Sequence, residues 1–350
     1  MAKTLLNYGI LGTFKTTQLG LIAQWLHKEY GGVIRMLTAD SGLGPVREFI
    51  DAGIIHHINL NSCQYPVAVV KRVSKGYWPK KIDLATGKIN ESTLALTTEK
   101  EWPGVSGYLI EGITRIAELY KIDSERKGRS LGEPLQGTDK AAMQAELGEQ
   151  YLGASRGTYM GAQGLTADYV ERFKGLPVAW VVYTGHESKG EDENDRPCYG
   201  PAVLGKALNS VVGGWFENTL HSQQFQYEKA IPGGKKVMRM GVRMFFMSHP
   251  DSTYKNMMWP AKLGVSPRIQ AQVEKKWPGG FVPILMDENG EYVSSVVDLL
   301  NVIDPPPASE VVEEAQATPE DFTELSDTGS EEEAEGKEVK EDEENESGAE

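Results

Sequence analysis

The hydrophobic pattern of the first 304 residues alternates between short apolar runs and apolar positions at helical spacing. Short runs of the kind that form buried strands occupy residues 4–8, 33–39, 54–60, 108–110, 178–184 and 237–248. Helical spacing covers residues 16–30, 45–52, 67–74 and 113–122 between them. Strands that alternate with helices in this order predict an α/β fold with a mostly parallel central sheet.

Two stretches depart from this alternation. Residues 76–102 have polar flanks around a Thr-Gly pair, so we interpret them as a β-hairpin insertion on the core. Residues 123–164 interleave Gly, Arg and Tyr, and we expect a long loop there that contains a helix at 139–150. Further predictions are a helix at 169–174, a broken helix at 202–221, an edge strand at 281–285 and a final helix at 292–303.

Acidic residues are concentrated at the end of the chain. The net charge is −14, but residues 308–350 alone carry 18 acidic and 2 basic side chains, so the rest is close to neutral. This segment follows a run of three prolines and is rich in Glu, Ser, Gly and Ala. It cannot bury enough apolar surface to compensate for ordering. We therefore predict one domain over residues 1–304 and a disordered acidic tail over residues 305–350.

Export and membrane signals are not recognisable in the sequence. The first residues, MAKTLLNYG, have no usable signal-peptide core, and no apolar run reaches the roughly 18 residues that span a bilayer. Two cysteines, Cys63 and Cys198, lie far apart and predict free thiols in a reducing compartment. These features lead us to expect a cytoplasmic protein.

The segment KTLLNYGILGTFKTTQL, residues 3–19, predicts a strand, a tight loop and the start of a helix. The loop is close to the phosphate-binding pattern GxxxxGK[ST], in which backbone N–H groups cradle phosphates. In that pattern the lysine reaches the β- and γ-phosphates and the next hydroxyl binds Mg²⁺, so ATP and Mg²⁺ are the expected ligands. The residues expected to hold the nucleotide are Gly9, Gly12, Thr13, Phe14, Lys15, Thr16 and Thr17.

One position departs from the phosphate-loop pattern. Phe14 stands where the second glycine is expected, and a bulky side chain does not suit a backbone conformation that only glycine takes readily. The residue fits a phosphate loop if its φ is negative. An ordinary structural turn is the alternative interpretation of the segment.

Two carboxylates follow predicted strands. Glu111 ends the apolar strand at 108–110, where a phosphate loop requires an acidic partner that holds Mg²⁺ directly or through water. Asp40 follows the strand at 33–39 and is a candidate for activating the attacking water. The alternative for Asp40 is a helix cap before Pro45.

Further candidates follow the later strands. Thr184 and His186 end the strand at 178–184 and are placed to sense a γ-phosphate, although a single histidine is as often an ordinary surface residue. Lys262, with Lys255 and Arg268 nearby in the sequence, is a candidate for stabilising charge during phosphoryl transfer. Solvated loop cations are the alternative for these three residues.

With its motifs in this order, the chain resembles the RecA-like P-loop ATPases, and most closely small phage-encoded AAA-domain or single-strand-annealing recombination ATPases. Some RecA-like proteins have an aromatic residue before the phosphate-loop lysine, as Phe14 is here. The segment TADSGLGPVREFIDAGI is similar to the RecA stretch that carries the catalytic carboxylate, which places Asp40 in that role. YLIEG occupies the Walker B slot and VVYTGHE the sensor strand, so the resemblance covers roughly residues 3–268.

The resemblance implies how such a protein assembles and what it contacts. ATP lies between protomers of a homo-oligomer, and a cation from the next subunit, here Lys262, completes the site. DNA-facing loops follow the Walker B and sensor strands, here residues 123–164 and 185–201. The first loop offers cations and an aromatic ring for single-stranded DNA, namely Arg126, Lys127, Arg129, Arg156 and Tyr159. The second loop is net acidic, which argues against DNA binding.

The predicted function is ATP hydrolysis by a RecA-like phage protein that acts on single-stranded DNA in recombination or replication. The alternative is a nucleotide-dependent phage assembly or interaction protein that does not bind DNA. A small-molecule kinase is disfavoured, since neither an acceptor site nor an Arg-rich lid is recognisable. The acidic tail has three interpretations: it solubilises the protein, it docks on a protein partner, or it competes with DNA for the protein's own basic surface.

Overall fold

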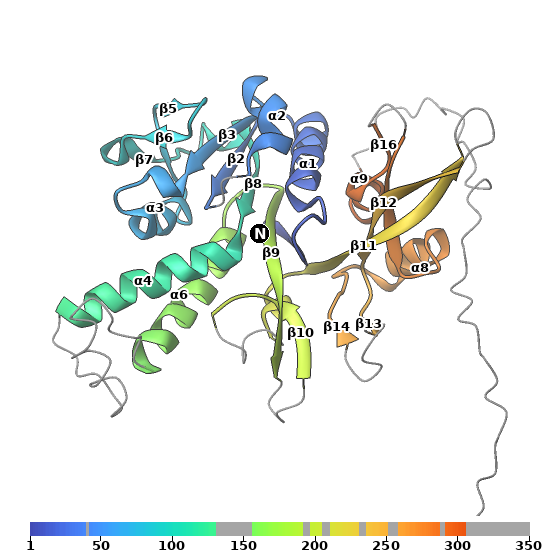
Figure 1. The fold of residues 1–350 in the computed structure, drawn as a ribbon. Helices are drawn as coiled ribbons and strands as arrows, with labels where there is room; N and C mark the ends of the chain where they lie inside the picture. The colour runs from blue at the N-terminus through green and yellow to red at the C-terminus, as the bar shows by residue number, and fades with distance from the viewer. Residues whose placement is uncertain are drawn as a thin grey trace, which may run out of the picture.

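The computed structural model describes residues 1–39, 42–130, 156–191, 197–204, 211–230, 236–250, 258–287 and 291–305. Its main feature is a ten-stranded sheet that runs through the centre of the molecule (Figure 1). Nine strands follow the order β16-β15-β12-β11-β1-β9-β8-β2-β3, and β10 (Pro197–Pro201) pairs with β9 off this path.

Six strands form the parallel part of the sheet. They are β1 (Lys3–Gly9), β2 (Val33–Thr38), β3 (Ile55–Asn59), β8 (Val105–Glu111), β9 (Trp180–Glu191) and β11 (Asn218–Ala230). β9 lies between β1 and β8, so one strand separates the first strand from the strand that ends in Glu111. The carboxyl ends of these strands share one edge, which is where ligands bind in open α/β sheets.

The remaining strands extend the sheet beyond β11 in antiparallel fashion. They are β12 (Lys236–Phe245), β15 (Phe281–Met286) and β16 (Tyr292–Ser294). The predicted α/β fold with a mostly parallel central sheet is therefore confirmed.

Helices cover both faces of the sheet (Figure 1). One layer contains α1 (Lys15–Tyr30), α8 (Pro267–Lys276) and α9 (Val296–Ile303), and the other contains α3 (Pro66–Val73), α4 (Ile113–Ser130) and α6 (Arg156–Lys174). Alternate residues of β9 serve the two cores: Trp180 and Val182 face the first layer, whereas Val181 and Tyr183 face the second. All four side chains are buried, and each burial of this kind stabilises the fold by about 1.5–3 kcal/mol.

The predicted insertion at 76–102 is confirmed as a pair of short β-ladders. β4 (Tyr77–Pro79) pairs with β7 (Leu94–Leu96), and β5 (Ile82–Asp83) pairs with β6 (Lys88–Ile89). Gly87 precedes β6 with a φ of 68°, and a Cβ on it would lie 2.6 Å from the His57 ring. A larger residue does not fit there, so the Thr-Gly pair correctly marks the turn.

Two predicted loops are in fact regular structure. Helix α4 continues to Ser130 and α6 begins at Arg156, so a long loop over residues 123–164 is wrong at both ends. The segment at 185–201 is largely a hairpin, because β9 continues to Glu191 and pairs with β10. The predicted helix at 139–150 lies outside the described residues.

The predicted helix at 202–221 is wrong over its described final part. Residues 205–210 lie outside the described residues, Val212–Trp215 forms a 3₁₀ turn, and strand β11 begins at Asn218. Side chains at the start of β11 alternate between the two faces of the sheet: Leu220 joins the core beneath α1, whereas the His221 ring lies beside Tyr8 on the other face. This two-residue period is that of a strand.

Near the end of the domain, three further differences appear. The helix predicted at 292–303 begins only at Val296, because Tyr292–Ser294 form strand β16. β15 is paired on both sides, by β12 and β16, so it is not the edge strand that the pattern predicts. Helix α8 has no counterpart among the predictions, although Ser266 and Pro267 are a typical helix start. The Ser266 side chain accepts a hydrogen bond from the Ile269 N–H.

The described part of the chain ends at residue 305, so the tail predicted to be disordered lies outside it, except for its first residue. Among the described helices, none has the combination of length and apolar character that a membrane-spanning segment needs.

Candidate nucleotide-binding site

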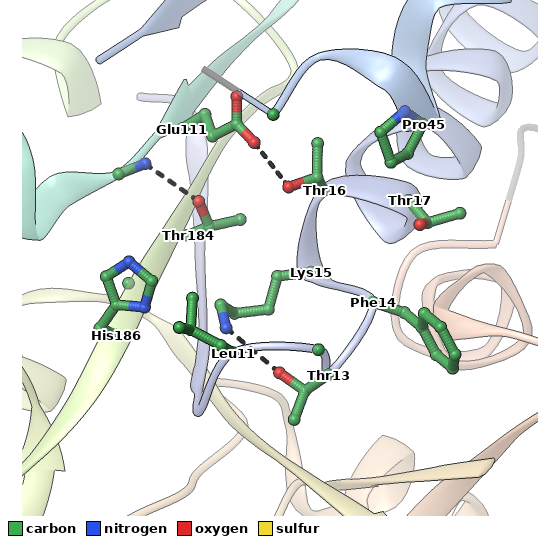
Figure 2. Close-up of a pocket in the computed structure, with 14 residues that line it drawn as sticks. Leu11, Thr13, Phe14, Lys15, Thr16, Thr17, Pro45, Glu111, Thr184 and His186 are labelled. Carbon is green, nitrogen blue, oxygen red and sulfur yellow. Dashed lines mark hydrogen bonds between the residues drawn. The ribbon is translucent and has the colours of Figure 1, made fainter. Parts of the chain in front are cut away.

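A cavity of about 450 Å³ lies at the carboxyl edge of the parallel strands, beside the first turn of α1 (Figure 2). The loop residues 11–17 form one wall of it. Glu111 at the end of β8, with Thr184 and His186 of β9, forms the opposite wall. The structure thus brings together the predicted phosphate loop and the side chains that end two neighbouring strands.

Phe14 adopts the left-handed conformation, with φ 53° and ψ 23°, at the N-cap of α1. The negative φ suggested for this residue is therefore wrong. In the described part of the chain, Phe14 is the one residue other than glycine with a positive φ. Its ring packs on the hydrophobic core beneath α1 and points away from Glu111 and His186 (Figure 2). The position has the backbone geometry of the expected glycine, at a cost of about 1–2 kcal/mol that packing of the ring helps to offset.

This strain predicts an unusual order of stability for two Phe14 variants. Both Phe14→Gly and Phe14→Ala lose the packing of the ring, but only glycine takes a positive φ without strain. We expect Phe14→Gly to be more stable than Phe14→Ala by about 1 kcal/mol, the reverse of the usual preference. Urea unfolding of both full-length variants measures the difference. A Phe14→Ala variant at least as stable as Phe14→Gly would contradict the left-handed geometry.

Lys15 closes the loop on itself. Its Nζ donates hydrogen bonds to the carbonyl oxygens of Gly9 at 2.9 Å and Ile10 at 2.6 Å, and to Thr13 Oγ1 at 3.2 Å. Gly9 is the last residue of β1 and lies at the base of the loop rather than in the cavity wall. The ammonium group is held by loop oxygens, and the residue lines the cavity.

Glu111 connects the loop to the sheet. Its side chain is buried, with 2% exposure, and accepts hydrogen bonds from two hydroxyl groups. Thr16 Oγ1 donates to Oε1 at 2.6 Å, and Thr38 Oγ1 donates to Oε2 at 2.9 Å. The first turn of α1 is thereby joined to the ends of β8 and β2. A hydroxyl and a carboxylate at this separation are oxygen donors of the kind that Mg²⁺ binds.

Thr184 and His186 lie on the face of β9 that borders the cavity (Figure 2). Thr184 Oγ1 accepts a hydrogen bond from the Gly112 N–H at 3.0 Å, which ties β9 to the end of β8. The backbone N–H of His186 donates to Thr114 Oγ1 at 3.2 Å, and the ring is half-buried. Both residues line the cavity, as the sequence predicts for this strand end.

The cavity fits a nucleotide phosphate chain by the chemistry of its donors. Helix α1 starts at Lys15, and the first helical N–H bond runs from Gln18 to the Phe14 carbonyl, so the preceding N–H groups have no intrahelical acceptor. The N-terminus of a helix attracts anions through such groups and through its dipole. Thr16 and Glu111 are the residues that would hold Mg²⁺ with the nucleotide.

Several predicted site residues are not among those that line this cavity, most of them because they lie outside the description. Asp40 lies outside the described residues, as does Lys255. Lys262 is exposed, and its backbone forms a two-way bridge with Thr219 of β11. It is not among the residues lining the cavity of its own chain. The predicted DNA-contacting residues belong to helical segments whose side chains lie outside the description, namely Arg126, Lys127, Arg129, Arg156 and Tyr159.

Sequence reasoning missed two polar residues that support the site. Thr38 is a polar residue at the end of the apolar strand β2. The same pattern identified Glu111 at the end of β8, so it could also have identified Thr38. Gln224 of β11 donates to the Gly12 carbonyl at 2.7 Å, and its amide would lie 2.6 Å from a Cβ at Gly12. No local pattern connects Gln224 to the loop, because the contact depends on the pairing of β11 with β1.

The opposite face of the same strand ends carries a buried polar cluster. His221 Nε2 and Glu187 Oε2 lie 2.9 Å apart, and His221 Nδ1 lies 2.9 Å from His249 Nε2. Burial lowers the pKa of His221, and the nearby Glu187 carboxylate opposes this shift. The Tyr8 ring lies beside His221 at a tilt of 36°, and burial raises the pKa of the Tyr8 hydroxyl. Glu187 adjoins the cavity wall in sequence, since it follows His186, and Tyr8 precedes Gly9 at the base of the loop.

Comparisons with known proteins add little to this geometry. No protein-family model matches the chain, and no curated protein matches it. Among solved structures, the chain is similar to a KaiC-like protein from the hyperthermophilic archaeon Pyrococcus horikoshii, with 12% identity and a TM-score of 0.35. The similarity covers 83% of this chain and 88% of that chain. It is too low to transfer residue roles or an activity.

Proposed function

We propose that this protein is a RecA-like P-loop ATPase that binds ATP with Mg²⁺ and hydrolyses it. The observation that carries the proposal is the 2.6 Å hydrogen bond between Thr16 of the phosphate loop and Glu111 at the end of β8. A loop hydroxyl and a strand-end carboxylate that meet beside a helix N-terminus form the arrangement that phosphoryl transfer requires. The left-handed Phe14 supports it further, because strained backbone concentrates at functional sites.

The proposed roles of the side chains follow from their positions. Lys15 binds phosphate oxygens, and Thr16 with Glu111 orients the metal. Bound Mg²⁺ supplies charge neutralisation between the phosphates. His186 senses the γ-phosphate from β9. Asp40, in the role implied by the resemblance, activates the attacking water.

We further propose that the hydrolysis serves work on single-stranded DNA in phage recombination or replication, by a homo-oligomer in which Lys262 reaches the neighbouring subunit's nucleotide. The exposure of Lys262 supports a role towards another subunit rather than towards its own cavity. The acidic tail is proposed to dock on a partner protein or to compete with DNA.

A second candidate is a nucleotide-dependent assembly or interaction protein without DNA binding. The observation in its favour is the acidic character of the β9–β10 hairpin, which carries Glu187 and Glu191. The intervening residues 192–196 add three more acidic side chains and one basic side chain in sequence. Such a hairpin repels a phosphate backbone and suits a basic protein surface.

ATP hydrolysis with and without single-stranded DNA separates the two candidates. We expect magnesium-dependent phosphate release from the full-length protein, and a severalfold increase when an oligothymidine is added. Omitting Mg²⁺ is the control for the site. Hydrolysis that DNA leaves unchanged would favour the assembly protein, and an inert protein would refute the ATPase itself.

A further inference from the structure

The insertion carries a second groove, of about 890 Å³, away from the nucleotide site. Its polar lining consists chiefly of donors, namely Lys80, Lys81, Lys88, Asn90, Ser92 and Thr93. The three lysines are exposed to solvent. Asp83 is the one acidic residue in the lining. The groove thus combines three cations with amide and hydroxyl groups on one surface.

Asp83 is occupied by the turn that it helps to form. Its Oδ2 accepts a hydrogen bond from Thr86 Oγ1 at 2.5 Å, and its Oδ1 accepts one from the Ala85 N–H at 3.0 Å. These hydrogen bonds lower the pKa of the Asp83 carboxyl. Lys88 is its cross-strand neighbour, so Asp83 offsets one cation at most. The residues that line the groove therefore carry a net positive charge.

The groove is built on a fixed frame. The Gly87 carbonyl accepts a hydrogen bond from the Asn59 N–H at 3.0 Å, which attaches the β5–β6 hairpin to the end of β3. Arg47 Nη1 donates to the Ala85 carbonyl at 2.8 Å from α2 (Arg47–Asp51). Arg72 Nη2 donates to the carbonyl of Leu94, a groove residue, at 2.8 Å. The lysines therefore project from a surface anchored at three points.

The segment that precedes the insertion in the chain adds charge and an aromatic ring. Helix α3 carries Lys71 and Arg72, and Lys75 follows it, so residues 71–90 contain six cations and a single acidic residue. Glu91 is turned towards the start of α3, where its Oε1 accepts hydrogen bonds from the backbone N–H groups of residues 64 and 65. Tyr65 at that point is 60% exposed. Cations beside an exposed aromatic ring are the combination that binds single-stranded nucleic acid.

We propose that this groove binds the phosphate backbone of single-stranded nucleic acid, with the lysines on successive phosphates and Tyr65 stacking on a base. The inference deepens the proposed function and rests on it for the role of the nucleic acid. It places the strand on the insertion, rather than on the segments 123–164 and 185–201 that the resemblance implies. The binding chemistry itself does not depend on ATP hydrolysis.

The groove is also connected to the nucleotide cavity. Arg47, which holds the hairpin, begins the helix that follows Pro45, and Pro45 lines the cavity. Asn61 Nδ2 donates to the Ala39 carbonyl at 2.8 Å, from the end of β3 to the end of β2. The hairpin that carries Lys88 is therefore hydrogen-bonded to the segment that reaches the nucleotide cavity.

A charge-neutralising triple variant tests the inference. The variant K80Q/K81Q/K88Q keeps side-chain length, and K28Q/K275Q/K276Q is the control with the same change in charge at exposed lysines elsewhere. Fluorescence anisotropy of labelled oligothymidine and oligouridine, over a range of salt concentrations, measures binding to the full-length proteins. We expect the groove variant to bind about tenfold more weakly or worse and its salt slope to fall by about 2, since each single-strand phosphate contact contributes about 0.7.

The control variant is expected to stay within about twofold of the wild type, because its lysines lie outside the groove. Weaker binding of either oligonucleotide by the groove variant alone supports the inference. The oligonucleotide that the wild type binds more tightly shows whether the groove prefers DNA or RNA. Equal weakening of both triple variants, or a wild-type protein that binds neither oligonucleotide, would overturn it. ATP hydrolysis without DNA is measured in parallel. If hydrolysis persists while oligonucleotide binding is absent, only the proposal for the groove is wrong. If binding persists without hydrolysis, only the proposed ATPase activity is wrong.

Discussion

Lys15→Ala is expected to abolish ATP turnover and to leave the fold intact. The Lys15 ammonium group is the centre of the loop, within 3.2 Å of three loop oxygens. Alanine removes the charge that meets the phosphates, and water can replace the lysine at the freed carbonyl group of Ile10, which is exposed. Loss of one preorganised donor of this kind lowers turnover by about 100- to 1,000-fold.

Steady-state phosphate release by the purified variant checks this expectation. Lys28→Ala is the matched control, because Lys28 lies on the same helix with 82% of its side chain exposed. The control should turn over ATP at the wild-type rate, and both variants should keep the wild-type circular dichroism spectrum. A Lys15→Ala variant with normal turnover would mean that the nucleotide binds elsewhere.

Glu111→Gln is expected to lower turnover by about 100-fold or more and to raise the Mg²⁺ concentration needed for half-maximal rate. The glutamine has nearly the shape of the glutamate, and its amide can still bond Thr16 and Thr38, since a hydroxyl group donates or accepts. The variant therefore removes the negative charge while it keeps the hydrogen-bond network that joins α1 to β8.

A magnesium titration of the initial rate measures the effect. Glu118→Gln serves as the control, because Glu118 lies on α4 in an exposed ion pair with Arg115. Its replacement should change neither the rate nor the magnesium dependence. If Glu111→Gln retained both, Glu111 would be a structural acceptor for the two threonines, without a part in holding the metal.

Local sequence patterns predicted the helices and strands correctly where the hydrophobic positions of a segment followed one period, that of a helix or that of a strand. The apolar runs of β1, β2, β3 and β9 are buried on both faces of a parallel sheet, so each reads as a strand without knowledge of its neighbours. The turn at the Thr-Gly pair of the insertion was also predicted correctly, because the requirement for glycine at residue 87 is local. The error at 202–221 arose where a 3₁₀ turn containing two glycines adjoins the half-polar start of β11.

The contacts of the site could be predicted only in part. Lys15 and Thr16 belong to one contiguous motif, and Glu111 was recognisable as a polar end to an apolar strand. Thr38 and Gln224 have no such motif, and their roles follow from strand order. The conformation of Phe14 was predicted incorrectly, because steric preference favours negative φ and only packing of its ring on the core offsets the strain.

The sequence by itself determined the α/β class, the phosphate loop between β1 and α1, the insertion and the acidic tail composition, since each depends on neighbouring residues. Tertiary structure alone decided that Thr16 meets Glu111 and that Gln224 reaches Gly12, because these contacts require β9 and β11 to flank β1. It also decided that Lys80, Lys81 and Lys88 share one groove. Hairpin pairing places these cations on one surface, whereas along the chain they are scattered among neutral and acidic residues of an insertion with little net charge.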